Sequence, residues 1–75
     1  MNITQRENEV LDLISRGYSQ FEISAQLYIS PHTVKTHKKN LFLKMDASNM
    51  AQLVRKGFEW GLLSLGSDLH IIKAS

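Results

Sequence analysis

Residues 30–45 read SPHTVKTHKKNLFLKM, and this stretch predicts a helix whose two sides differ in chemistry. Ser30 is suited to cap the start, because its hydroxyl can accept a hydrogen bond from a free backbone N–H of the first turn. Pro31 then occupies the first helical position, where its missing N–H has no intrahelical partner to lose. The beginning of this helix is therefore well marked.

The apolar residues of this helix fall on one side when successive positions are turned by about 100°. That side collects Val34, Leu41 and Met45, with His37, Lys38 and Phe42 at its margins. The opposite side collects His32, Lys35, Thr36, Lys39 and Leu43. We expect the first side to face a core and the second to be free for contact.

Charge within residues 30–45 is unbalanced, since the stretch holds four lysines and no Asp or Glu. Such a helix carries a positive field that suits a polyanion. A lysine-rich face can equally be plain solvated surface. The segments upstream decide between these two interpretations.

Length and composition predict one small soluble domain. The chain has 75 residues, a formal net charge of +2 and no cysteine, so disulfides and thiolate metal sites are excluded. No apolar run approaches the roughly 20 residues that cross a bilayer, and the N-terminus lacks the basic-then-apolar pattern of a signal peptide. We expect a cytoplasmic protein without a membrane partner.

Two capping boxes mark helices that precede the lysine-rich one. Thr4 and Glu7 form the first, and Gly17 can end the helix that follows, which we place at about residues 5–16. Ser19 and Glu22 form the second and open a helix of about residues 20–28.

Only a short link separates the second predicted helix from the lysine-rich one. The residues Tyr28, Ile29 and Ser30 make this link, and so brief a connection forces the two helices to cross steeply. Ser24 is small enough to let them approach. The arrangement is a helix-turn-helix, and it favours the interpretation that the lysine side binds a polyanion over plain solvated surface.

A fourth helix is predicted at about residues 49–61, with Ser48 as its cap. Its apolar stripe includes Met50, Val54 and Phe58, which we expect to serve a partner subunit as well as the core. Residues 66–75 show no clear period and are interpreted as a C-terminal tail. Core packing is the expectation for four of the six aromatic residues, namely Tyr18, Phe21, Tyr28 and Trp60.

The order and spacing of these pieces resemble the DNA-binding module of LuxR-type bacterial transcription regulators, also called GerE-like or NarL/FixJ-type. The matching stretches are residues 3–11, 17–24, 27–30, 33–37, 40–41, 44–45 and 61–63. The resemblance covers about residues 3–65 and implies a compact, all-α, four-helix domain. It further implies that the third helix, residues 31–45, enters the major groove and that the fourth, residues 49–61, supplies a dimer contact.

The resemblance also implies roles for single residues. Base contacts fall on His32, Lys35, Thr36 and Lys39, and phosphate contacts on Ser19, Gln20, Thr33, Lys38 and Lys44. The dimer contact falls on Met50, Val54 and Phe58. Two positions depart from the family pattern, since Gln20 stands where Asn is common and Met50 where Arg is common.

The expected function is sequence-specific binding of double-stranded DNA by a homodimer in the bacterial nucleoid, without a cofactor, a metal or a small-molecule ligand. An alternative is a protein-interaction module that pairs with another regulator and titrates it from DNA. A sensor or regulator acting in trans is a further expected partner, and the sequence leaves open whether the chain is free-standing or a fragment. Catalysis is disfavoured, because His32 and His37 are too far apart around one helix to share a ligand.

Overall fold

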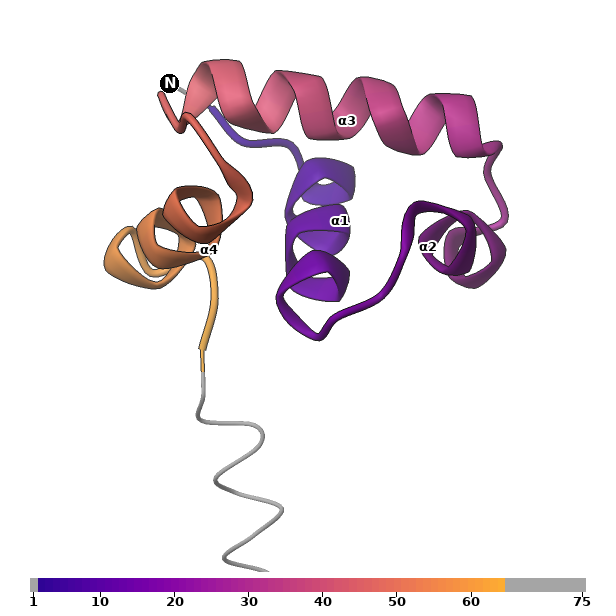
Figure 1. Cartoon of the computed structure of the whole chain (residues 1–75), viewed down its shortest axis with the longest axis horizontal. Helices are drawn as coiled ribbons and strands as arrows, with labels where there is room; N and C mark the ends of the chain where they lie inside the picture. The colour runs from indigo at the N-terminus through magenta and orange to yellow at the C-terminus, as the bar shows by residue number, and fades with distance from the viewer. Residues whose placement is uncertain (1, 65–75) are drawn as a thin grey trace, which may run out of the picture.

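The computed structural model describes residues 2–64, and within them it contains four helices and no strand (Figure 1). The helices are α1 (Gln5–Ser15), α2 (Gln20–Leu27), α3 (Pro31–Lys44) and α4 (Met50–Glu59). The predicted all-α, four-helix class is therefore confirmed. The predicted tail, residues 66–75, lies outside the described residues.

The first three predicted helices were each one residue too long at the C-terminal end, and the fourth was one residue too long at its start and two at its end. Arg16, Tyr28 and Met45 are the C-terminal caps of α1, α2 and α3 rather than helical residues. At α4 the cap is Asn49, whose side chain accepts from the backbone N–H of Gln52 at 2.9 Å, so the prediction of Ser48 was wrong. Asn and Ser are equally good caps, and sequence alone did not separate two such neighbours.

The first two helices begin at the predicted capping boxes. The Thr4 hydroxyl accepts from the Glu7 amide at 3.1 Å, while the Glu7 carboxylate accepts from the Thr4 amide at 2.9 Å. Ser19 and Glu22 exchange the same pair of bonds at 3.2 and 2.7 Å. Both pairs satisfy backbone donors that the helix itself leaves unpaired.

Gly17 ends α1 as its position predicted. Its φ of +89° reverses the chain, and the amides of Gly17 and Tyr18 donate to the carbonyls of Ile14 and Leu13 at 3.0 and 3.1 Å. This pairing satisfies the last free carbonyls of the helix. The left-handed conformation suits glycine, because it has no Cβ to clash with the backbone.

The four helices surround one aliphatic core. In Figure 1, α3 lies across one end of α1, and α2 and α4 flank α1 on opposite sides. The buried hydrophobic residues are Val10, Leu11, Ile14, Ile23, Val34, Leu41, Met45, Leu53 and Leu63. Three of them, Val34, Leu41 and Met45, are 0% exposed, which confirms the predicted inward side of α3.

The four aromatic residues that were predicted to pack in the core do not fill it, contrary to the sequence prediction. The exposed fractions are 38% for Tyr18, 72% for Phe21, 95% for Tyr28 and 48% for Trp60. Phe21 lies on the side of α2 opposite Ile23, and Tyr28 turns outward where the chain adopts a left-handed conformation with φ of +57°. The core of so short a chain is instead filled by aliphatic side chains.

Candidate nucleic-acid interface

The outer side of α3 is exposed to solvent. His32, Lys35, Thr36 and Lys39 are all exposed, as the periodicity predicted. The helix holds 14 residues and is therefore about 21 Å long. Because its inner side is anchored by fully buried residues, the outer side chains extend from a rigid support.

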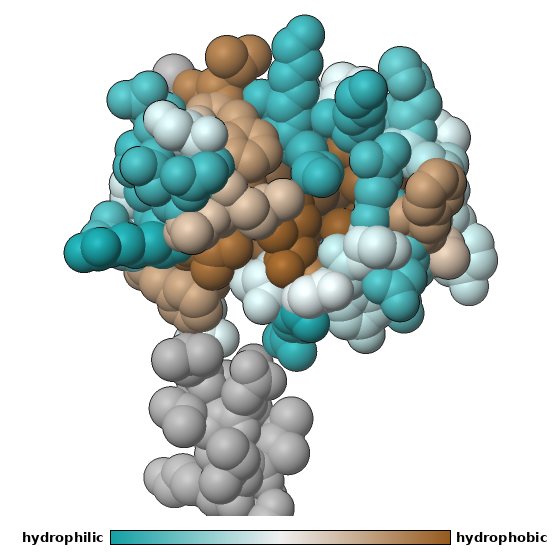
Figure 2. Space-filling view, in the orientation of Figure 1, coloured by the Kyte–Doolittle hydropathy of each residue, from teal (hydrophilic) through white to brown (hydrophobic). Residues whose placement is uncertain are grey.

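Positive charge dominates the outer side of α3 and its margin, where the half-buried Lys38 lies. Within residues 2–64, Lys35, Lys38 and Lys39 form no ion pair with an acidic side chain. Figure 2 shows hydrophilic side chains projecting along the edge of the molecule that α3 forms. The three ammonium groups are thus available to an external anion.

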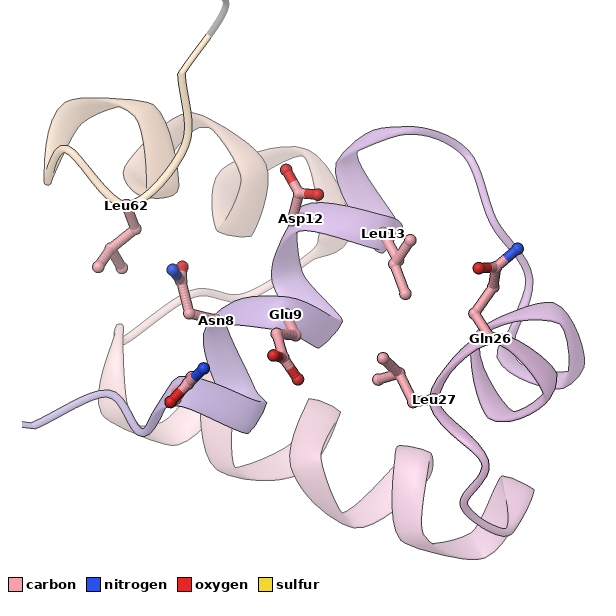
Figure 3. A pocket seen from close by; sticks show the side chains of 8 residues that line it. Asn8, Glu9, Asp12, Leu13, Gln26, Leu27 and Leu62 are labelled. Carbon is pink, nitrogen blue, oxygen red and sulfur yellow. The ribbon is translucent and has the colours of Figure 1, made fainter. Parts of the chain in front are cut away.

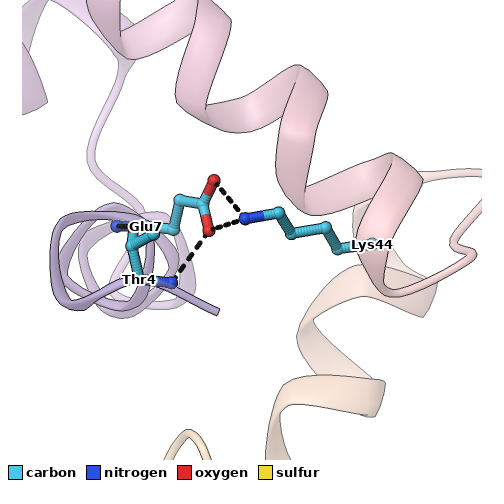
Figure 4. Close-up of polar contacts among 3 residues, drawn as sticks. All are labelled: Thr4, Glu7 and Lys44. Atoms are coloured by element: carbon cyan, nitrogen blue, oxygen red, sulfur yellow. Dashed lines mark hydrogen bonds and ion pairs between the residues drawn. The ribbon is translucent and has the colours of Figure 1, made fainter. Parts of the chain in front are cut away.

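Lys44 is the exception among the four lysines of α3. Its Nζ donates to both carboxylate oxygens of Glu7, at 2.7 and 3.0 Å (Figure 4). The Glu7 side chain is only 3% exposed and the Lys44 side chain 27%. This ammonium group binds α1 to the end of α3, so the structure gives Lys44 a role other than the phosphate contact that was expected of it.

The ion pair alters the acidity of Glu7. Burial raises the pKa of its carboxyl, but the hydrogen bonds from Lys44 and the Thr4 amide, with the Lys44 charge, act in the opposite direction and prevail. The pKa therefore lies below its ordinary value. The carboxylate is ionised at neutral pH, which is the state that the Lys44 ammonium group requires.

The start of α2 is joined directly to the start of α3. The Gln20 side-chain amide donates to the Pro31 carbonyl at 3.0 Å, a contact that the sequence did not reveal. Ser30 accepts from the Thr33 amide at 3.0 Å and shares a hydrogen bond with the Thr33 hydroxyl at 2.9 Å. Ser19 is exposed beside this junction, while Gln20 and Thr33 are half-buried.

A second candidate surface runs along α4. This helix is anchored by Leu53, which is 0% exposed, and by Gly57. Met50 and Phe58 are 39% and 37% exposed, and Val54 between them is half-buried. Positions four residues apart lie on one side of a helix, so these three form an apolar strip at the edge of the core.

A cleft among the described residues lies away from the outer side of α3. It has a volume of about 480 Å³ and is lined by Gln5, Asn8, Glu9, Asp12, Leu13, Gln26, Leu27 and Leu62. Figure 3 shows that its polar side chains come from α1 and α2 and that Leu62 approaches from the chain after α4. Glu9 and Asp12 are paired with Arg6 and Arg16 at 3.1 and 3.0 Å.

Neither a metal cluster nor a membrane-spanning helix is present in the part of the chain that the structure describes. No group of three or more His, Cys, Asp or Glu side chains within residues 2–64 is placed to hold a metal ion. None of the four helices is long and apolar enough to cross a bilayer.

Comparison with known proteins identifies the helix-turn-helix. The family model described as "GerE: Bacterial regulatory proteins, luxR family" matches residues 1–56. The chain belongs to the luxR family of bacterial regulatory proteins. This luxR-family domain is accordingly a DNA-binding domain of transcription regulation.

Curated relatives of this luxR-family domain are longer proteins. The chain is 39% identical over 61 residues to the response regulator protein VraR of Staphylococcus aureus, a match that covers 81% of this chain and 29% of VraR. VraR of Staphylococcus epidermidis gives the same figures. The chain thus spans less than a third of the length of these relatives.

Solved structures agree with the family. The transcription factor GerE superposes with a TM-score of 0.78 at 40% identity, covering 83% of this chain and 92% of GerE. The response regulator ChrA of a heme-sensing two-component system gives a TM-score of 0.79 at 28% identity, covering 84% of this chain and 31% of ChrA. The helix-turn-helix of this luxR-family domain therefore has the GerE-like arrangement.

Proposed function

We propose that this protein binds specific sequences of double-stranded DNA by inserting α3 into the major groove. The observation that carries the proposal is the outer side of α3, where Lys35 and Lys39 lie exposed beside His32 and Thr36 without an acidic partner in residues 2–64. The major groove is about 12 Å wide and admits a single helix. Lysines on such a helix release counterions from the DNA, which gives affinity that falls with salt.

Base recognition falls to the residues at the centre of this side. Lys35 and Lys39 donate to O6 and N7 of guanine, and Thr36 offers its methyl group to thymine. The Thr36 hydroxyl already donates to the His32 carbonyl at 3.2 Å, so its hydrogen is engaged within the helix. His32 contacts a base near the start of the helix.

Phosphate contacts surround these base contacts. Ser19 caps α2 and Gln20 is its first residue, and the helix dipole at this N-terminus attracts an anion. Thr33 and Lys38 flank the outer side of α3. Lys44 is left out of this set, because its ammonium group is engaged by the buried Glu7 carboxylate.

Binding as a homodimer follows from the small size of the contact. Few base contacts are available to one copy, each worth about 1–3 kcal/mol of discrimination. Two copies paired through Met50, Val54 and Phe58 of α4 read two half-sites about one helical turn apart. Residues 1–65 form the DNA-binding domain, and the protein acts at the nucleoid in the bacterial cytoplasm, where a sensor or regulator in trans controls it.

Selection of binding sites from a pool of random duplexes, followed by footprinting, tests this function. We expect enrichment of a two-fold symmetric sequence whose half-sites are one turn apart. Enrichment of a single half-site contradicts binding as a dimer but leaves DNA recognition by α3 standing. Failure to bind any duplex at low salt contradicts DNA recognition, and it supports a module that pairs through α4 with another regulator.

A further inference from the structure

Leu43 is an apolar side chain that α3 presents to solvent. It is 68% exposed, whereas Leu41 and Met45, two positions to either side, are both 0% exposed. Within α3, which the structure describes in full, Leu43 is the single exposed large hydrophobic residue. The core therefore does not account for this leucine.

Leu43 lies on the line of the proposed base contacts. At about 100° per residue, it is rotated about 20° from His32 and about 40° from Lys39 around the helix axis. Along the axis it lies about 6 Å beyond Lys39.

The last turn of α3 differs in charge from the turns before it. The ammonium group of Lys44 is directed to Glu7 of α1, and Phe42 is half-buried. Leu43 is therefore the outward group of a turn that offers no free cation to a phosphate. The outer side of α3 thus presents lysines in its earlier turns and a hydrocarbon side chain, Leu43, in its last turn.

We propose that Leu43 reads the methyl group of a thymine, an inference that rests on the proposed DNA binding. The C5 methyl of thymine is the apolar group that base pairs offer in the major groove. Base pairs are about 3.4 Å apart along each strand, so this thymine lies about two base pairs beyond the pair that Lys39 contacts. Leu43 thus fixes one end of the recognised half-site.

Replacement of single thymines by deoxyuridine tests this inference, because the exchange removes the methyl group and leaves the hydrogen-bonding edge intact. Each thymine of the selected half-site is exchanged in turn, and Kd is measured by fluorescence anisotropy. For the wild-type protein we expect one exchange, about two base pairs past the Lys39 contact, to raise Kd about fourfold, the effect of one buried methyl group.

Two variants assign the effect to Leu43. For the sensitive position, the Kd of the deoxyuridine duplex is divided by the Kd of the thymine duplex. In Leu43→Ala this ratio falls to about one, whereas Lys39→Ala binds both duplexes more weakly and keeps the fourfold ratio. Leu43→Ala is expected to melt as the wild type does, since the side chain is exposed and alanine favours helix.

The outcomes separate this inference from the function on which it rests. Specific binding that is indifferent to every deoxyuridine, a ratio that persists in Leu43→Ala, or a selected half-site without thymine at that end overturns the role of Leu43 and leaves DNA recognition standing. Absence of any specific binding overturns both. If Leu43→Ala binds DNA as the wild type does but no longer retains a protein that co-purifies with the wild type, Leu43 contacts that protein and not a thymine.

Discussion

Removing the Lys44 side-chain charge should destabilise the domain strongly, although Lys44 lies on the lysine-rich helix. In Lys44→Met the Glu7 carboxylate loses its cation but stays buried, since Glu7 is only 3% exposed. Loss of one partner of a buried ion pair costs about 3–5 kcal/mol. Glu7 keeps the bond from the Thr4 amide at 2.9 Å, and Lys44 is 27% exposed, so we expect about 2–3 kcal/mol.

Thermal unfolding followed by circular dichroism measures this loss. For a domain of this size, about 2–3 kcal/mol corresponds to a fall in Tm on the order of 10–20 °C. Lys38→Met is the matched control, because Lys38 is half-buried on the same helix and forms no ion pair within residues 2–64. We expect the control to stay near the wild type.

A second variant distinguishes the cost of an unpaired buried charge from the cost of lost packing. Glu7→Gln combined with Lys44→Met removes the buried charge but keeps an acceptor for the Thr4 amide. The double variant should therefore melt above Lys44→Met alone. If Lys44→Met melts as high as Lys38→Met, or if adding Glu7→Gln lowers Tm further, the Glu7–Lys44 pair does not stabilise the fold in this way.

Two further predictions concern acid stability and self-association. The lowered pKa of Glu7 means that its ionised form stabilises the fold above the ordinary value of 4.5, and that this stabilisation is lost as pH falls through the lower folded pKa. Tm measured from neutral to acidic pH should consequently fall less steeply for Glu7→Gln than for the wild type, and parallel curves would disprove the assignment. Phe58→Glu should weaken self-association in sedimentation equilibrium at least tenfold, about 1.4 kcal/mol, because it adds a charge to the apolar strip. Ala25→Glu adds the same charge to the exposed side of α2 and should leave self-association unchanged. Equal self-association of the two variants would show that α4 is not the interface.

Local patterns in the sequence were sufficient to predict the helices and the two sides of α3. Capping boxes act within three residues, and Thr4 and Glu7 were recognised for that reason. The 3.6-residue period placed Val34 inside and Lys39 outside, as the structure has them. The DNA contacts of the outer side stay predictions.

Contacts between distant residues were beyond the sequence. Glu7 and Lys44 are 37 positions apart, and nothing in the local pattern distinguishes Lys44 from the lysines that remain available. The same limit applies to Gly57, where an added Cβ would lie 2.7 Å from Leu63 Cδ1. Such pairings depend on how the helices cross, which a helical period does not specify.

The exposed aromatic residues show a different limit. Hydrophobic size predicted burial for Phe21 and Tyr28, but burial depends on which side of α2 faces the core. α2 directs Ile23 inward, and the opposite side is left to Phe21. A helix of eight residues is too short for its period to resolve the two sides.

The salt dependence of DNA affinity in lysine variants shows whether the outer side of α3 meets DNA. Kd for the selected duplex is measured from low to high salt for the wild type, for Lys35→Ala/Lys39→Ala, and for Arg55→Ala as a control that removes a cation, 81% exposed, from α4. We predict that the double lysine variant binds more weakly at every salt concentration, because two base contacts are lost. We also predict that its slope of log Kd against log salt is shallower, because two cations leave the groove, whereas affinity and slope are unchanged in the control. A slope and an affinity that stay at the wild-type values in Lys35→Ala/Lys39→Ala would contradict the claim that the outer side of α3 meets DNA.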